Sequence, residues 1–196
     1  MCKIIACDTF ALAAFLASSY FHLMKRERLS PQSWIEAGLS ELAAQGPNAL
    51  AAEPLARKLE TTKGSFYWHF KDVPDFQAAV IKHWQSAAFS DVLQSLEENG
   101  NAEQRLRRFG KKVLSNSQDP AMRAWARADK KVAKAIAQVD AERMKYLTNL
   151  LRHLGIANDD FARGSLAALV GLPTIGNKTQ ASKAFETMID LILALK

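Results

Sequence analysis

The sequence predicts an all-α protein of one or two domains. Apolar residues recur at helical spacing in one segment after another from Ser30 onward, and no segment shows the alternation typical of a strand. Residues that start and stop helices separate these segments: Ser30 and Pro31 precede the first, and Gly46 and Pro47 follow it. The chain has 196 residues, of which 48% are hydrophobic, so it is long enough to bury a core.

Two short helices are expected first. One begins at Pro31, with Ser30 as its N-cap, and ends before Gly46. Its apolar stripe comprises Ile35, Leu39, Leu42 and Ala43. The other spans roughly Glu53 to Leu59, because proline is tolerated in a first helical turn and Pro54 falls there.

The third expected helix lies in the stretch TTKGSFYWHFKD, residues 61–72, with Thr62 as its N-cap. At about 100° per residue, Phe66 and Phe70 share one face and Trp68 points nearly the opposite way. The outer face, its edges and its ends comprise Thr62, Lys63, Gly64, Ser65, Tyr67, Trp68, His69 and Lys71. Such a face suits the major groove of DNA, because it offers cations, hydroxyls and a close backbone approach. The alternative is an aromatic cluster buried against another helix.

Residues 30–84 resemble the N-terminal DNA-binding domain of TetR-family transcriptional regulators. The matching features are a first helix ending at Gly46, a second helix reading EPLARKL, and the third-helix motif from Thr62 to Lys71. The resemblance implies an N-terminal helix-turn-helix head over residues 27–87 and a helical ligand-binding and dimerisation domain over residues 88–196. It also implies DNA-contact roles for the eight residues just given and packing roles for Phe66 and Phe70.

The same resemblance implies a cytoplasmic homodimer that binds a double-stranded DNA operator, as a repressor released by a small-molecule effector. No membrane partner is expected. Two positions depart from the family pattern. Glu60 stands where glycine is usual and must adopt a turn conformation that glycine adopts more easily, and Ala51 replaces a capping hydroxyl.

Charge supports a dimer. The chain is basic, with net charge +6. The range between Met24 and Gln85, however, contains eight basic and seven acidic residues, so its net charge is only +1. The positive charges of the head are therefore expected to be concentrated at two places, just before the first helix and around Lys63 and Lys71. Each head is therefore expected to make few phosphate contacts, and two heads bound to one DNA site would be needed for useful affinity.

The rest of the chain predicts five more helices. A long one opens at Asp72 and runs towards Gly100, with Phe76, Val80, Trp84 and Ala88 at steps of four. A second contains Leu106, Phe109 and Val113 and has a basic opposite side, interpreted as a solvated face. A third ends at Gly155, and the last two cover residues 161–170 and 185–195. By resemblance, the last two would form a four-helix dimer interface; packing inside one chain is the alternative.

Effector residues are less defined by the sequence. An apolar pocket between helices is expected from Trp84, Phe109, Met122, Trp125 and Tyr146, with plain core packing as the alternative for each. The four histidines show no metal-ligand spacing, so neither a metal nor a cofactor is expected.

Residues 1–23 are interpreted as an extension of doubtful function, with the functional chain beginning at Met24. The segment is apolar, so an export signal and a membrane anchor are its alternatives. Both cysteines, Cys2 and Cys7, lie in it, and a disulfide framework is excluded.

Other function classes find weaker support. No nucleophile motif or paired histidine indicates an enzyme. Residues 171–179, GLPTIGNKT, resemble a phosphate-binding loop, but Asn177 is inserted before Lys178 and no strand precedes it. A loop between the last two helices is the preferred interpretation. A nucleotide-binding helical protein and a membrane-tethered helical interaction protein remain the alternatives to a DNA-binding regulator.

Overall fold

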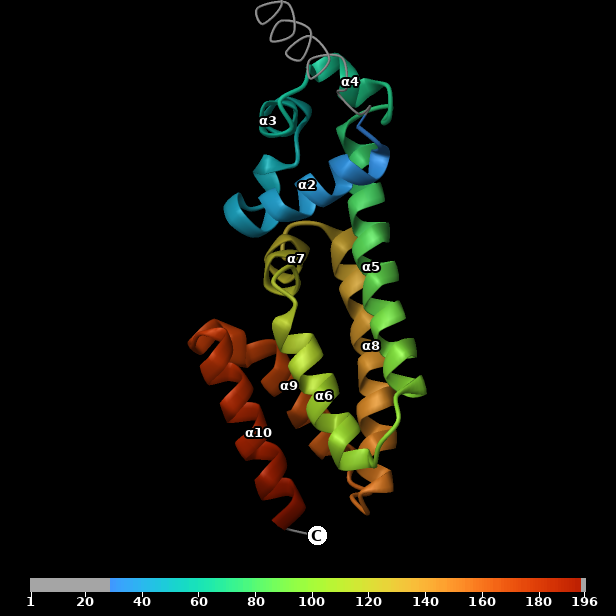
Figure 1. Ribbon diagram of the computed structural model, residues 1–196, viewed down its shortest axis with the longest axis vertical. Helices are drawn as coiled ribbons and strands as arrows, with labels where there is room; N and C mark the ends of the chain where they lie inside the picture. Colours follow the sequence, from blue (N-terminus) through green and yellow to red (C-terminus); the bar gives the residue numbers. More distant parts are fainter. Residues whose placement is uncertain (1–28, 195–196) are drawn as a thin grey trace, which may run out of the picture. The chain divides into compact units, whose positions relative to one another are not determined.

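The computed structural model describes residues 29–194, and the extension at 1–23 lies outside the described residues. Within that range the chain is helical and has no strand, as the sequence predicts. The helices are α2 (Pro31–Gln45), the 3-10 helix η1 (Pro47–Ala49), α3 (Ala52–Lys58), α4 (Lys63–Tyr67), α5 (Val73–Glu97), α6 (Ala102–Ser115), α7 (Asp119–Ala126), α8 (Lys130–His153), α9 (Asp159–Ile175) and α10 (Lys178–Ala194) (Figure 1).

Helices α2 to α10 belong to one compact unit, residues Pro31–Lys196. The expected boundary at residue 87 falls inside α5, which continues without interruption from the α2–α4 region to the C-terminal helices (Figure 1). None of the helices within residues 29–194 is long and apolar enough to span a bilayer.

Local sequence explains the ends of the first helices. Gly46 has a φ of 81° after α2, so glycine is required where the chain turns. Thr62 caps α4, accepting a hydrogen bond at Oγ1 from the Ser65 amide at 3.3 Å. Glu60 is the one non-glycine residue with positive φ in residues 29–194, at 50°, as its place in the turn predicts. Ala51 precedes α3 without a side-chain cap, also as expected.

Helix α5 follows its sequence pattern closely. Asp72 caps it by accepting from the Asp75 amide at 2.8 Å. The four apolar residues expected at steps of four, Phe76, Val80, Trp84 and Ala88, are at most 2% exposed. The helix packs mainly along α8 and also contacts α2, so one straight element contacts both the head and the C-terminal helices.

A second core joins α6, α8, α9 and α10. Its tightest point is Gly110 of α6, where a Cβ would lie only 2.1 Å from a ring carbon of Phe185 in α10. The helices approach this closely because glycine has no side chain there. The apolar stripe expected on α10 comprises Phe185, Met188, Ile189 and Ile192. It packs against this core: Phe185, Ile189 and Ile192 are at most 6% exposed, and Met188 is half-buried. Phe185, Ile189 and Ile192 therefore contribute to the core of their own chain, and a dimer interface formed by the last two helices stays a prediction.

Three other expectations need correction. Helix α7 was not predicted, because its eight residues are too few for a clear apolar period. Helix α9 runs to Ile175 through Pro173, so residues 171–175 are helical and only Gly176 and Asn177 connect it to α10. The loop interpretation and the phosphate-loop resemblance of residues 171–179 are both wrong for the helical part.

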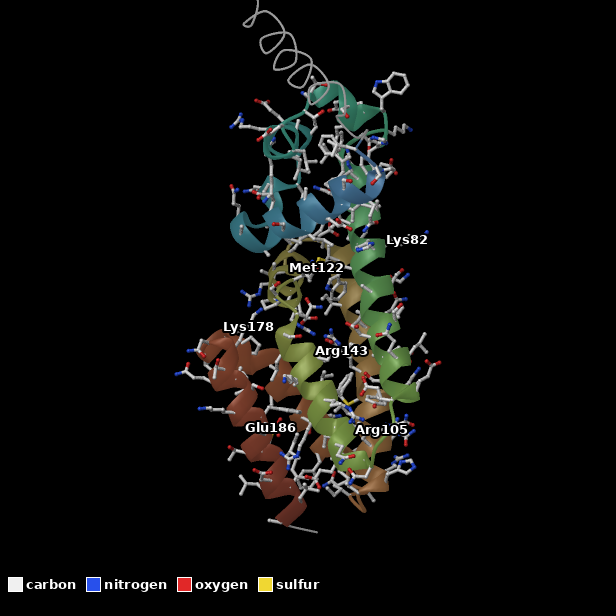
Figure 2. The ribbon with its side chains drawn as sticks, viewed as in Figure 1. Lys82, Arg105, Met122, Arg143, Lys178 and Glu186 are labelled. Carbon is white, nitrogen blue, oxygen red and sulfur yellow. The ribbon has the colours of Figure 1, made fainter. Side chains whose placement is uncertain are left out.

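The basic side of α6 is not a plain solvated face. Arg107 pairs with Glu186 and Asp190 of α10 and with Glu103 of its own helix. These bonds, that to Asp190 foremost, raise the pKa of Arg107 above its usual value. Figure 2 labels Glu186 on α10. Arg108 pairs with Glu98, and Lys112 with Asp91. Most of the basic side therefore ties α6 to its neighbours.

Candidate nucleic-acid interface

The inner side of α4 is held by an aromatic cluster. The Phe66 ring contacts Trp34 of α2 edge to face, with centroids 5.4 Å apart, and Phe76 of α5 at 5.2 Å. Phe70 packs against Phe76 at 4.9 Å. Phe66 is fully buried and Phe70 is 5% exposed, so the packing roles expected for both are confirmed by their burial. Each aromatic contact of this kind adds about 0.5–1.5 kcal/mol beyond the burial of its area.

The outer side of α4 is open. Trp68 is 88% exposed and Tyr67 is 47% exposed, so both aromatic rings are accessible to a partner. Thr62, Lys63, Gly64 and Lys71 are also exposed, whereas Ser65 and His69 are half-buried. All eight residues expected to contact DNA therefore belong to one short segment, α4 and the turn after it.

One detail differs from the expected geometry. Helix α4 ends at Tyr67, and Trp68, in αR conformation, is its C-cap. His69 lies in the turn, where its amide donates to the Phe66 carbonyl at 3.0 Å. The helical phase assumed up to Lys71 therefore holds only for the first turn and a half. Because Phe66 and Phe70 are both buried, the turn still directs Trp68 outward.

The cations of the segment differ in their partners. Arg57 and Lys58 of α3 pair with Glu53 and Glu41. Lys63 and Lys71, at the two ends of the α4 segment, form no ion pair with any residue that the structure describes. An ammonium without a carboxylate partner keeps its full attraction for phosphate. The basic residues before the first helix, Lys25, Arg26 and Arg28, lie outside the described residues.

The five residues expected to line an effector pocket come from four helices. Trp84 lies on α5, Phe109 on α6, Met122 and Trp125 on α7, and Tyr146 on α8. All are at most 5% exposed, and the rings of Phe109 and Tyr146 touch at 4.8 Å. Their burial is compatible with both an effector pocket and plain core packing, so the pocket stays a prediction.

Sequence reasoning missed a buried charge cluster between α7 and α8 (Figure 2 labels Arg143). Asp119 accepts from Arg143 at 2.8 Å and from Arg123 at 2.7 Å, and Arg123 forms two bonds to Asp140 at 2.7 and 2.8 Å. Burial lowers the pKa of Arg123, but its hydrogen bonds to Asp140 and the charges of Asp119 and Asp140 outweigh burial, so the pKa lies above its usual value. The spacing Asp119–Arg123 and Asp140–Arg143, one helical turn each, was the available signal.

No group of histidine, cysteine or acidic side chains within residues 29–194 is arranged to hold a metal ion.

Comparison with known proteins places the helix-turn-helix segment in a family. Residues 35–72 match the model described as bacterial regulatory proteins, tetR family. No curated protein matches the chain. Among solved structures, a transcriptional regulator from Rhodococcus sp. Rha1 is similar with a TM-score of 0.68 and 16% identity, covering 85% of this chain and 97% of its own. A TetR-family transcriptional regulator from Streptomyces coelicolor gives 0.69 and 13%, covering 89% and 94%.

The fatty acid degradation regulator FadR from Bacillus halodurans is also similar, with a TM-score of 0.61, 12% identity, and coverage of 86% of this chain and 96% of its own. At such identities the likeness concerns the fold. The resemblance to TetR-family regulators is thus confirmed: the chain has the family's N-terminal helix-turn-helix segment, set in the all-helical fold of structures described as TetR-family regulators.

Proposed function

We propose that the protein is a transcriptional regulator that binds a specific double-stranded DNA operator through α4 and the turn after it. The observation that supports this most is the two-sided segment itself. Its inner aromatic side is locked to α2 and α5, while Tyr67, Trp68, Lys63 and Lys71 remain exposed. A rigid helix that presents hydroxyls, aromatic rings and unpaired ammonium groups is suited to base edges and phosphates in the major groove.

The protein acts as a homodimer in this proposal. One head offers few unpaired cations, so a single head would bind DNA weakly at physiological salt. A dimer with two-fold symmetry would bind a pseudo-palindrome with half-sites about one helical turn, or a multiple, apart.

The dimer surface is proposed on the outer sides of α9 and α10, not on the buried stripe of α10. Ile175 is 81% exposed and Leu191 is 63% exposed. On α9 the exposed residues Gly164 and Ala167 are small, which permits close approach of a second helix. A groove of about 360 Å³ is lined by Gly164, and the buried hydroxyl of Ser165 at its wall has no hydrogen-bond partner within the described residues.

A small-molecule effector would release the operator from a repressor. In this proposal the effector binds among the buried side chains of α5 to α8 that the sequence predicts to line a pocket. The indole N–H of Trp84 on α5 is buried without a hydrogen bond to any described residue, so an effector with an acceptor atom beside it would satisfy it. Helix α7, which carries Met122 and Trp125, packs on both α8 and α2, so a shift of α7 would reach the head.

The test is selection of bound duplexes from a random pool, followed by titration of the selected duplex at several salt concentrations. The proposal expects a pseudo-palindromic sequence bound by two chains, with an affinity that falls as salt rises. Enrichment of no sequence, or equal affinity for selected and scrambled duplexes, would contradict it. A reporter gene placed behind the selected sequence then distinguishes repression from activation.

A further inference from the structure

A cationic pocket lies between the end of α6 and the start of α10. It has a volume of about 370 Å³, and its polar lining residues are Lys111, Ser115, Lys178, Thr179, Ser182 and Lys183. Leu114 forms an apolar wall, and no carboxylate lines the pocket. Figure 2 labels Lys178 at the first turn of α10.

Within the described residues, the three ammonium groups lack carboxylate partners, unlike three of the cations of α6. Arg107, Arg108 and Lys112 each have a carboxylate partner. Lys111, Lys178 and Lys183 form no ion pair with any residue in the described part of the chain. The three exposed lysines bring three like charges to one hollow, which attracts an anion.

Hydrogen-bond donors surround the same space. The hydroxyls of Thr179 and Ser182 donate to no described residue, while that of Ser115 is already committed to the Lys112 carbonyl. Lys178 donates from Nζ to the Ser115 carbonyl at 3.2 Å, which holds its ammonium at the junction of the two helices and offsets the negative end of α6. The positive end of the 17-residue α10 adds to the field.

We propose that this pocket binds a phosphate group, either as inorganic phosphate or as the phosphate of a small phosphorylated molecule. A dianion with three or four acceptor oxygens matches three ammonium groups and two hydroxyls better than a carboxylate does, because more acceptors are satisfied at once. The volume is near the lower end for small-molecule sites, about 300–1,000 Å³, which suits a small organic phosphate with its carbon part against Leu114. The site is separate from α4 and does not rest on the proposed operator binding.

The test uses the full chain and titration calorimetry with inorganic phosphate, with glycerol phosphate, and with sulfate. Saturable binding of a phosphate probe with a Kd of about 1 mM or lower supports the site. Tighter binding of glycerol phosphate than of inorganic phosphate identifies a phosphomonoester as the ligand, and the reverse order identifies free phosphate. Absence of saturable binding for both phosphate probes, or equal binding of sulfate and phosphate, would overturn the proposal.

The matched variants are Lys183→Gln and Lys111→Gln, with Lys134→Gln as control. Lys134 is an exposed lysine of α8 outside the pocket, so the control makes the same change in total charge. Each pocket variant is expected to weaken phosphate binding roughly tenfold, and the control to leave it unchanged. Equal weakening by all three variants would mean that only total charge matters. A loss of duplex binding in the pocket variants without any loss of phosphate binding would assign the lysines to DNA instead, and either result would overturn the proposal.

Discussion

Phe66 is fully buried, and Trp68, two residues later, is 88% exposed. The two aromatic side chains thus have opposite environments within one short segment. Phe66 contacts Trp34 and Phe76, and these contacts hold α4 in place. Trp68 is exposed, so packing within the chain does not account for an aromatic residue at this position. The first side chain has a structural role, and the second is available to a partner.

This contrast predicts separable effects on stability. Phe66→Ala should lower the free energy of unfolding by about 3–5 kcal/mol, because it opens a cavity among four aromatic rings. Trp68→Ala should change it by less than about 0.5 kcal/mol, because the side chain is exposed. Urea denaturation followed by circular dichroism measures both. Similar losses in the two variants would contradict the two-sided description of α4.

Replacing Glu60 by glycine should stabilise the protein. The φ of Glu60, 50°, lies in the left-handed region, so Glu60→Gly should raise the free energy of unfolding by about 1 kcal/mol. The same replacement at Glu36, an exposed residue inside α2, should lower it by about 1 kcal/mol, because glycine weakens a helix interior. Thermal denaturation of both variants checks the opposite signs, and a loss of stability at residue 60 would show that the left-handed backbone costs little there.

Gly110→Ala should be destabilising by about 1–3 kcal/mol, although alanine is the better helix former. The added Cβ would overlap the Phe185 ring, at 2.1 Å from its nearest carbon. Adding Phe185→Leu should recover part of that loss, since a smaller side chain makes room. Strict additivity of the two substitutions in a double-mutant cycle would count against close packing at this point.

Asp119→Ala should cost about 3–5 kcal/mol, because it leaves the guanidinium of Arg143, 3% exposed, without its closest carboxylate. Glu142→Ala is the matched control, since it breaks an exposed pair with Lys145 and should cost less than about 1 kcal/mol. Denaturant titration of both proteins measures the difference. A cost at Asp119 no larger than that at Glu142 would mean that the cluster is solvated in solution.

The sequence was sufficient for the head because its elements are marked locally. Thr62 and Asp72 are caps, Gly46 is a stop, and the buried phenylalanines of α4 follow from helical phase up to the turn after Tyr67. Glu60 was recognisable because it stands where the family that the chain resembles usually has glycine, and its φ of 50° agrees with that.

Features that depend on contacts between distant segments were not predictable in the same way. The stripe of Phe185, Ile189 and Ile192 is apolar whether it faces a partner or its own chain, and only the fold shows that it faces α6 and α9. Likewise Arg107 looks solvated in the sequence until α10 brings Glu186 and Asp190 beside it. Helix α7 has only eight residues, too few for its apolar periodicity to be recognised in the sequence.

The central claim, that the exposed side of α4 binds a specific operator, is tested most directly by fluorescence anisotropy with the selected duplex. Lys63→Ala and Tyr67→Ala are the test variants, and Lys134→Ala is the control for charge. We predict that both test variants lose specific binding by at least about tenfold, with unchanged helicity and an unchanged dimer, while the control binds as the parent does. Unchanged affinity of both test variants for the selected duplex would contradict the account.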